Sequence, residues 1–249
     1  SEPLTGNSNT ALGFKAGYSL EGAANSNVLV GTYAGDAIAT GGNNVAIGYN
    51  ALTSADGSEA RNVVIGVSSF SNLNIDGSNY NVGLGYHAGQ FCTTGENNTF
   101  IGGNSGQGIT GTKLTGSYNT CLGYSSVLLL QGDAQYNCII GSLAGDAITT
   151  GDYNTAIGNK SLSDATTADK NTAVGYQSLL SNTADKNTAV GAYAGNHNTS
   201  GTYSTFIGYE AGFGNASEKT TGDSNTAVGY RAGYALEGVA SGNVLIGSS

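Results

Sequence analysis

Methionine and tryptophan are absent from the 249-residue sequence, proline occurs once, and only 8 residues are lysine or arginine. With a net charge of -9 and no basic cluster, the chain lacks what binding to a phosphate backbone requires, so we expect no nucleic-acid partner. No run of 18 apolar residues occurs, so no membrane insertion is predicted. Because Ser1 is not an initiator methionine, we expect a processed product or a piece of a longer chain.

Histidine, with 2 residues, and cysteine, with 3, are too few and too dispersed to predict a metal centre. Cys92, Cys121 and Cys138 are expected to pack as small apolar residues. The aspartates lie in or beside glycine-containing turns, and turn chemistry accounts for them. We therefore predict no catalytic residue, no metal ligand, no cofactor and no enzymatic activity. Polysaccharide cleavage by paired carboxylates stays an alternative, and calcium at a turn carboxylate stays open without a predicted site.

Glycine is abundant, with 41 residues, and much of it belongs to a tandem repeat that begins Asn-[Thr/Val]-x-aliphatic-Gly. The repeat recurs 14 times at intervals of 16 to 21 residues, which predicts a single repeat domain over residues 1–249 whose coils begin at Asn9 and end near Gly247. The repeats start at Asn9, Asn27, Asn44, Asn62, Asn81, Asn98, Asn119, Asn137, Asn154, Asn171, Asn187, Ser204, Asn225 and Asn243.

Each column of the repeat has a physical role when the Asn is counted as position zero. Position one is threonine or valine in every repeat except at Cys138, and position three is always aliphatic, which predicts a β-strand. Position four is always glycine, and position seven is alanine or serine, as expected at a tight corner. These columns predict an all-β parallel β-solenoid (β-roll) of about 14 coils with two strands per coil, in which the stacked asparagines form an amide ladder.

Position two carries no charge in any repeat, although it lies between the two columns expected to face the core. A solvated strand face would contain polar residues, so we expect this column to face a sister chain in a homotrimer. The predicted subunit-interface column contains Ala11, Leu29, Ala46, Val64, Phe100, Cys121, Ile139, Phe206 and Leu245. The alternative is a monomer with a bland face.

Tyrosines recur at position five and directly before the Asn, where we expect them to shield corners and stack from coil to coil. Exposed aromatic rungs are also a platform for sugar rings, so a cell-surface glycan is a candidate partner. The candidates for surface contact are the position-six residues His87, Tyr193, Glu210 and Arg231.

The segment Asn-Thr-Ala-Val-Gly-Tyr-Gln-Ser-Leu at Asn171, with Asn-Thr-Ala-Ile-Gly at Asn154 and Asn-Val-Ala-Ile-Gly at Asn44, resembles the repeat arrays of bacteriophage tail-fibre and related bacterial surface proteins, which often end in an endosialidase-type intramolecular chaperone. It is similar, less closely, to the head repeats of trimeric autotransporter adhesins. The resemblance covers Asn9 to Gly247 and implies an obligate trimer that serves as a rigid shaft or a host-binding head. The chaperone segment is absent, which fits a fragment or a matured product.

The predicted function is therefore a structural or adhesive fibre segment of a virion or bacterial surface, located outside the cell. One alternative is a filament subunit that stacks head to tail, because residues 9–31 are closely echoed by residues 225–247 and neither end shows a polar cap. Another is an ice-binding solenoid, for which the threonines of position one would have to face outward rather than into the core as expected.

Overall fold

The computed structural model describes residues 6–217 and 219–248, and in these residues the chain contains 14 β-strands and no helix. The strand of each repeat covers positions one to three, as the sequence predicts. The strands are β1 (Thr10–Leu12), β2 (Val28–Val30), β3 (Val45–Ile47), β4 (Val63–Ile65), β5 (Val82–Leu84), β6 (Thr99–Ile101), β7 (Thr120–Leu122), β8 (Cys138–Ile140), β9 (Thr155–Ile157), β10 (Thr172–Val174), β11 (Thr188–Val190), β12 (Thr205–Ile207), β13 (Thr226–Val228) and β14 (Val244–Ile246). The prediction of an all-β parallel β-solenoid is confirmed.

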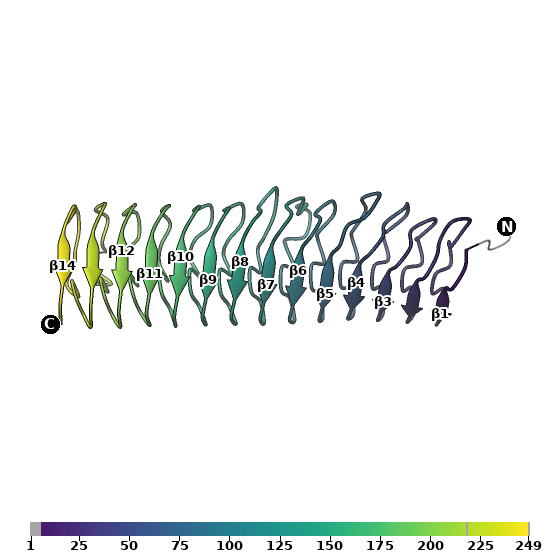
Figure 1. Ribbon diagram of the computed structural model, residues 1–249, viewed down its shortest axis with the longest axis horizontal. Helices are drawn as coiled ribbons and strands as arrows, with labels where there is room; N and C mark the ends of the chain where they lie inside the picture. The colour runs from purple at the N-terminus through teal and green to yellow at the C-terminus, as the bar shows by residue number, and fades with distance from the viewer. Residues whose placement is uncertain (1–5, 218, 249) are drawn as a thin grey trace. The chain divides into compact units, whose positions relative to one another are not determined.

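The described residues form two compact units. In the described residues, unit 1 comprises 6–125 and 130–134 and contains β1 to β7, and unit 2 comprises 126–129 and 135–248 and contains β8 to β14. Within each unit, neighbouring strands pair in parallel and lie side by side (Figure 1). Equivalent positions stack on one another, as in the pairing of Val45 with Val63 or of Thr172 with Thr188.

Each coil contains one strand, and the prediction of two strands per coil was wrong. The wall opposite the strand is a stack of turns that joins the next coil by single backbone hydrogen bonds, such as Gly35 N to Ala51 O at 2.9 Å. This wall cannot extend into a strand because its residues repeatedly adopt positive φ, for example 54° at Asn50 and 53° at Leu52. The turn wall therefore depends on its backbone conformation as well as on its hydrogen bonds.

The glycine at position four turns the chain out of the strand. Gly48 has a φ of 134°, and a Cβ atom added there would lie 2.5 Å from the carbonyl oxygen of Gly66 in the next coil. Gly175 has the same surroundings, with a φ of 136° and 2.5 Å to the carbonyl oxygen of Gly191. Only glycine combines this backbone conformation with this close approach, which explains why the column never varies.

Position two faces the core, and the prediction that it faces outward was wrong. Of the predicted subunit-interface column, Leu29, Ala46, Val64, Phe100, Cys121, Ile139 and Phe206 are fully buried within the chain itself. Ala11 is exposed and Leu245 is half-buried because β1 and β14 each pair with only one other strand. Successive residues of a strand point to opposite sides, so positions one and three lie on the outer face. This column therefore packs the solenoid interior and cannot contact a sister chain.

In about half of the coils, the core is filled by a size match between position two and position eight. Where position two is small, as at Ala46, position eight is the large Leu52, and both side chains are buried. Where position two is large, as at Phe100, position eight is Gly106, whose added Cβ would lie 2.5 Å from the Phe100 ring. In these coils one large and one small side chain together fill the narrow interior at native packing density.

The asparagines at position zero form the predicted amide ladder. Asn44 donates its backbone N–H to Oδ1 of Asn27 at 3.0 Å, and its Nδ2 donates to the carbonyl oxygen of Glu59 at 2.8 Å. In the one repeat that begins with serine, the backbone N–H of Asn225 instead donates to Oγ of Ser204 at 3.2 Å. The ladder satisfies buried backbone groups at each corner and fixes the register of the coils.

Candidate functional site: the outer strand face and an aromatic cluster

The outer strand face consists of the side chains at positions one and three of each strand. In unit 2, position three is aliphatic throughout, and Ile157, Val190 and Ile207 are 38%, 38% and 41% exposed. Position one of unit 2 contains a run of stacked threonines. This run is Thr155, Thr172, Thr188, Thr205 and Thr226.

In unit 1 the same face is mostly valine at position one and aliphatic at position three. Val63, Ile65 and Leu122 are exposed there, and neither column contains a charged residue in any repeat. Parallel sheets usually have both faces covered, so a row of stacked aliphatic side chains facing solvent marks a surface that fits a partner. The outer strand face therefore has the character that the sequence predicted for a subunit interface, at positions one and three instead of position two.

An aromatic cluster lies along the position-five, six and nine columns of unit 2. Its members are Tyr176, Tyr193, Tyr209, Phe213, Tyr230 and Tyr234. The rings of Tyr209 and Tyr230 stack with centroids 5.8 Å apart, and those of Phe213 and Tyr234 stack at 5.2 Å. Tyr193 packs edge-on against Phe213 at 6.2 Å and joins the two stacks. The predicted stacking of aromatic residues from coil to coil is confirmed in this cluster.

Three of the four predicted contact residues meet at this cluster. Tyr193, Glu210 and Arg231 occupy position six of successive coils, and Arg231 Nε donates to Glu210 Oε2 at 2.6 Å. The Arg231 guanidinium also lies over the rings of Tyr230 and Tyr234, at 5.4 and 5.0 Å from their centroids. The hydrogen bond to Glu210 raises the pKa of Arg231 further, so this charge is permanent. The ion pair and the ring contacts fix the polar border of the cluster.

The fourth predicted contact residue, His87, belongs to unit 1. Its ring stacks on Tyr86 with centroids 3.7 Å apart, and its Nδ1 lies 3.2 Å from Nε2 of Gln107. Burial lowers the pKa of His87, because it disfavours the charged ring. His87 is therefore occupied by its own coil neighbours and does not join the other three residues.

A hollow of about 450 Å³ adjoins the aromatic cluster in unit 2. His197, Phe213 and Tyr234 form its aromatic part, and Asn215 and Glu237 form its polar part. The rings of His197 and Phe213 meet edge to face at 5.0 Å. Burial, followed by the charge of Lys219, lowers the pKa of His197. Sequence reasoning found none of the residues of this hollow, since Phe213, Asn215 and Glu237 lie in turn segments outside the repeat motif.

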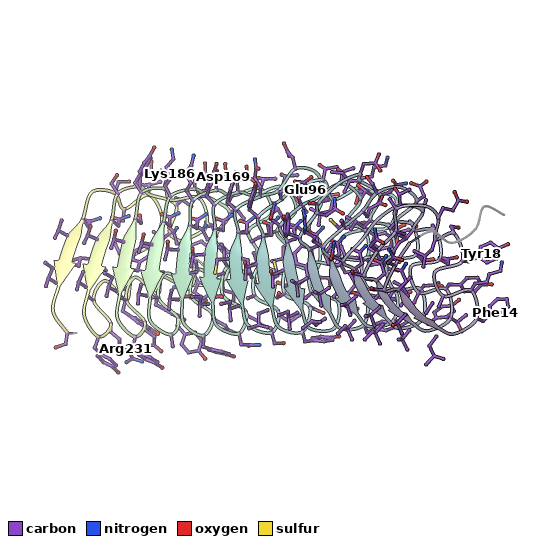
Figure 2. The ribbon with its side chains drawn as sticks, turned by 45° about the vertical axis from the view of Figure 1, so that its right-hand side comes forward. Phe14, Tyr18, Glu96, Asp169, Lys186 and Arg231 are labelled. Carbon is purple, nitrogen blue, oxygen red and sulfur yellow. The ribbon has the colours of Figure 1, made fainter. Side chains whose placement is uncertain are left out.

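The opposite edge of unit 2 carries a ladder of turn carboxylates, and Figure 2 shows Asp169 and Lys186 on that edge and Arg231 on the other. The backbone N–H of Asp152 donates to Oδ1 of Asp169 at 2.8 Å, and that of Asp169 donates to Oδ1 of Asp185 at 2.9 Å. Lys186 Nζ donates to the Tyr203 hydroxyl at 2.8 Å. These carboxylates accept turn N–H groups, as turn chemistry predicts. Among the described residues, no three or more His, Cys, Asp or Glu side chains are grouped so as to hold a metal ion.

Comparison of the chain with protein-family models, curated proteins and solved structures finds no match. Within residues 6–217 and 219–248, no helix suited to crossing a bilayer is present.

Burial raises the pKa of Cys92 to about 12, so this thiol is inert at neutral pH and packs as an apolar residue.

Proposed function

We propose that the chain is a non-enzymatic structural and adhesive fibre segment that works outside the cell and assembles as a homotrimer. The observation that carries this proposal is the outer strand face, whose position-three side chains are aliphatic in every repeat and are exposed or half-buried, but never buried, in the single chain. Interface cores are depleted of charge and rich in apolar contacts; the two columns of this face contain no charged residue, and position three is aliphatic in every repeat.

The outer strand face is narrow and repeats from coil to coil, which favours chains that run parallel to one another around a shared axis. Each coil contributes only two side chains to the outer strand face, so a partner must follow the stack to bury enough area for a stable complex. Within a unit, three copies that turn this face toward a common axis bury both columns of each coil, and cyclic closure leaves no copy of the face open. The resemblance of the repeats to trimeric fibre and adhesin arrays supports the same arrangement.

The solution mass of the full chain, measured by light scattering after size exclusion over a concentration series, tests the proposal. We expect a species near three times the 24.9 kDa chain. The double variant Val190→Glu, Ile207→Glu places two charges on the outer strand face and should yield monomers. Ser200→Glu adds a charge at an exposed turn of the same unit and should leave the mass unchanged. A monomeric wild type would overturn trimer assembly, and growth with concentration would instead favour head-to-tail stacking.

Ice binding is a second candidate function because the threonines of position one face outward, contrary to our expectation. In unit 2, the run from Thr155 to Thr226 is stacked in register beside a row of aliphatic side chains on one uncharged face. A trimer would cover this surface, whereas a monomer would leave it open to ice. Thermal hysteresis of the wild-type chain that disappears in Thr188→Lys would support ice binding, and no hysteresis in a monomeric sample would exclude it.

A further inference from the structure

We propose that the hollow beside the aromatic cluster of unit 2 binds a terminal neutral pyranose of a glycan. The hollow is lined by His197, Phe213, Asn215, Tyr234 and Glu237, together with Gly214 and Ala235 among others, and its volume of about 450 Å³ lies in the range of small-ligand sites. This inference deepens the adhesive part of the proposed function by naming the ligand class and the residues that hold it.

The aromatic part of the hollow suits the apolar face of a sugar ring. The rings of Phe213 and Tyr234 are nearly parallel, with an interplanar angle of 5°, and His197 stands edge-on to Phe213 at 81°. Tyr234 is 39% exposed, so ring surface is open to a ligand. The packing of Tyr193 against Phe213 and the position of Arg231 over Tyr234 hold these rings before a ligand arrives. Aromatic rings that are already fixed in place lose little conformational freedom when a ligand binds, which reduces the entropy cost of binding.

The polar part of the hollow suits sugar hydroxyls. Asn215 Nδ2 donates to Glu237 Oε1 at 3.1 Å, and Asn215 Oδ1 accepts the backbone N–H of Ser217 at 2.9 Å. These bonds orient both side chains, and a carboxylate has more acceptor sites than this one bond uses. A neutral sugar presents adjacent O–H donors to such an acceptor.

The charges favour a neutral ligand over an acidic one. Glu237 lines the hollow, and the nearby Arg231 is already paired with Glu210. The charge of Lys219 is close enough to lower the pKa of His197, and it opposes the charge of Glu237. A carboxylate at the contact itself disfavours an anionic sugar more than one exposed lysine attracts it, because solvent screens the lysine.

Two other hollows of the described residues do not combine these features. The hollow of about 240 Å³ in unit 1 has one aromatic ring, Phe91, beside Asn72 and Lys113. The hollow formed by Ala232, Leu245 and Ile246 has no polar side chain besides Ser248. Glu237 is the only carboxylate among the described residues that line the proposed site. Cleavage of a glycosidic bond requires two carboxylates, so we propose that this site binds the sugar without cleaving it.

Binding of the full chain to immobilised oligosaccharides ending in glucose, galactose, mannose or N-acetylglucosamine tests the inference, with a sialic-acid-terminated oligosaccharide alongside. We expect at least one neutral sugar to bind in preference to the sialylated one, with no release of reducing ends. Tyr234→Ala and Glu237→Gln should each weaken binding about tenfold, whereas Tyr234→Phe should retain most of it. Tyr153→Ala, an exposed tyrosine on the other edge of unit 2, is the matched control and should bind as the wild type does.

The inference would be overturned if the chain bound none of the neutral sugars, preferred the sialylated oligosaccharide, or cleaved an oligosaccharide. It would also be overturned if both site variants bound as the wild type does. Circular dichroism and thermal melts establish that the variants fold. Light scattering on the same samples tests assembly separately from sugar binding. If the chain is a trimer that binds no sugar, only the sugar site is contradicted. If the chain is a monomer that binds sugar, only the trimer is contradicted.

Discussion

At the scale of single residues, the fold depends on glycines that no other residue can replace. The sequence predicted the role of position four, since an invariant glycine after a strand indicates a backbone conformation closed to other residues. Gly102 and Gly103 are adjacent and differ in this respect. Gly102 has a φ of 129° and faces the carbonyl oxygen of Gly123, whereas a Cβ added at Gly103 meets only the Tyr124 ring at 3.6 Å.

We therefore expect Gly102→Ala to lower the free energy of unfolding by at least about 2 kcal/mol, from backbone strain and the collision with Gly123. Gly103→Ala should leave it unchanged or raise it by about 0.4–1 kcal/mol, because alanine restricts the unfolded chain. Chemical denaturation of both variants measures the difference. Equal stability of the two variants would contradict the assigned role of position four.

Glu59 is a buried carboxylate whose sequence context gave no signal. Its Oε2 accepts the backbone N–H of Gly57 at 2.9 Å, but its Oε1 accepts no hydrogen bond from the described residues. Burial raises the pKa of Glu59, and the charges of Asp76 and Asp56 add to the shift. The folded chain therefore favours the protonated carboxyl, and the contribution of this group to stability is lost as the pH rises through its folded pKa.

Glu59→Gln should raise the free energy of unfolding at pH 7 by roughly 1–3 kcal/mol, because it removes a buried charge with an unsatisfied oxygen. The gain should vanish below the unfolded pKa of glutamate, where the wild-type carboxyl is also neutral. Glu21→Gln, at an exposed site of the same unit, is the control and should have little effect at either pH. A destabilised Glu59→Gln variant at pH 7 would show that the charge itself is needed.

At the scale of the coil, the sequence predicted where the strands lie but not which way they face. Both outer columns of a strand are aliphatic or β-branched and the middle column is apolar, so a three-residue strand shows no alternation that distinguishes the core. A partial signal is the inverse size of positions two and eight in about half of the repeats, as in Ala173 with Leu179 and Phe206 with Gly212. Two columns that compensate in volume must share one interior.

The volume compensation between positions two and eight predicts that a substitution at one position can restore stability lost by a substitution at the other. Phe100→Ala should destabilise the chain by about 3–5 kcal/mol, because it leaves a cavity in the core. Adding Gly106→Leu recreates the pair found at Ala46 and Leu52, and should recover at least half of the loss. Leu52 already tolerates a φ of 53°, close to the 56° of Gly106. A double-mutant cycle by thermal or chemical denaturation measures the coupling, and additive losses would contradict the proposed packing.

The aromatic cluster was predictable only in part. Tyr193, Glu210 and Arg231 share one column of the repeat, so the sequence predicts that they lie close together. Asn215 and Glu237 lie in turn segments whose length varies between repeats, and no fixed spacing relates them to the motif. A repeat constrains what recurs, and this hollow arises where the repeat departs from its own pattern.

At the scale of the whole molecule, the central claim is that chains meet through the outer strand face. Cys138 lies at position one of β8, on that face, whereas Cys92 and Cys121 are buried in unit 1. The chain thus has one thiol on the proposed interface and two in a core, without any substitution.

The most direct measurement is the alkylation rate of Cys138 in the native chain, followed by mass spectrometry of the labelled peptides. In the assembled wild type we predict that Cys138 is protected as strongly as Cys92. In the dispersed Val190→Glu, Ile207→Glu variant it should react many times faster, while Cys92 and Cys121 stay unlabelled. An assembled wild type in which Cys138 reacts as fast as in the dispersed variant would contradict the account, because the chains would then meet through another surface.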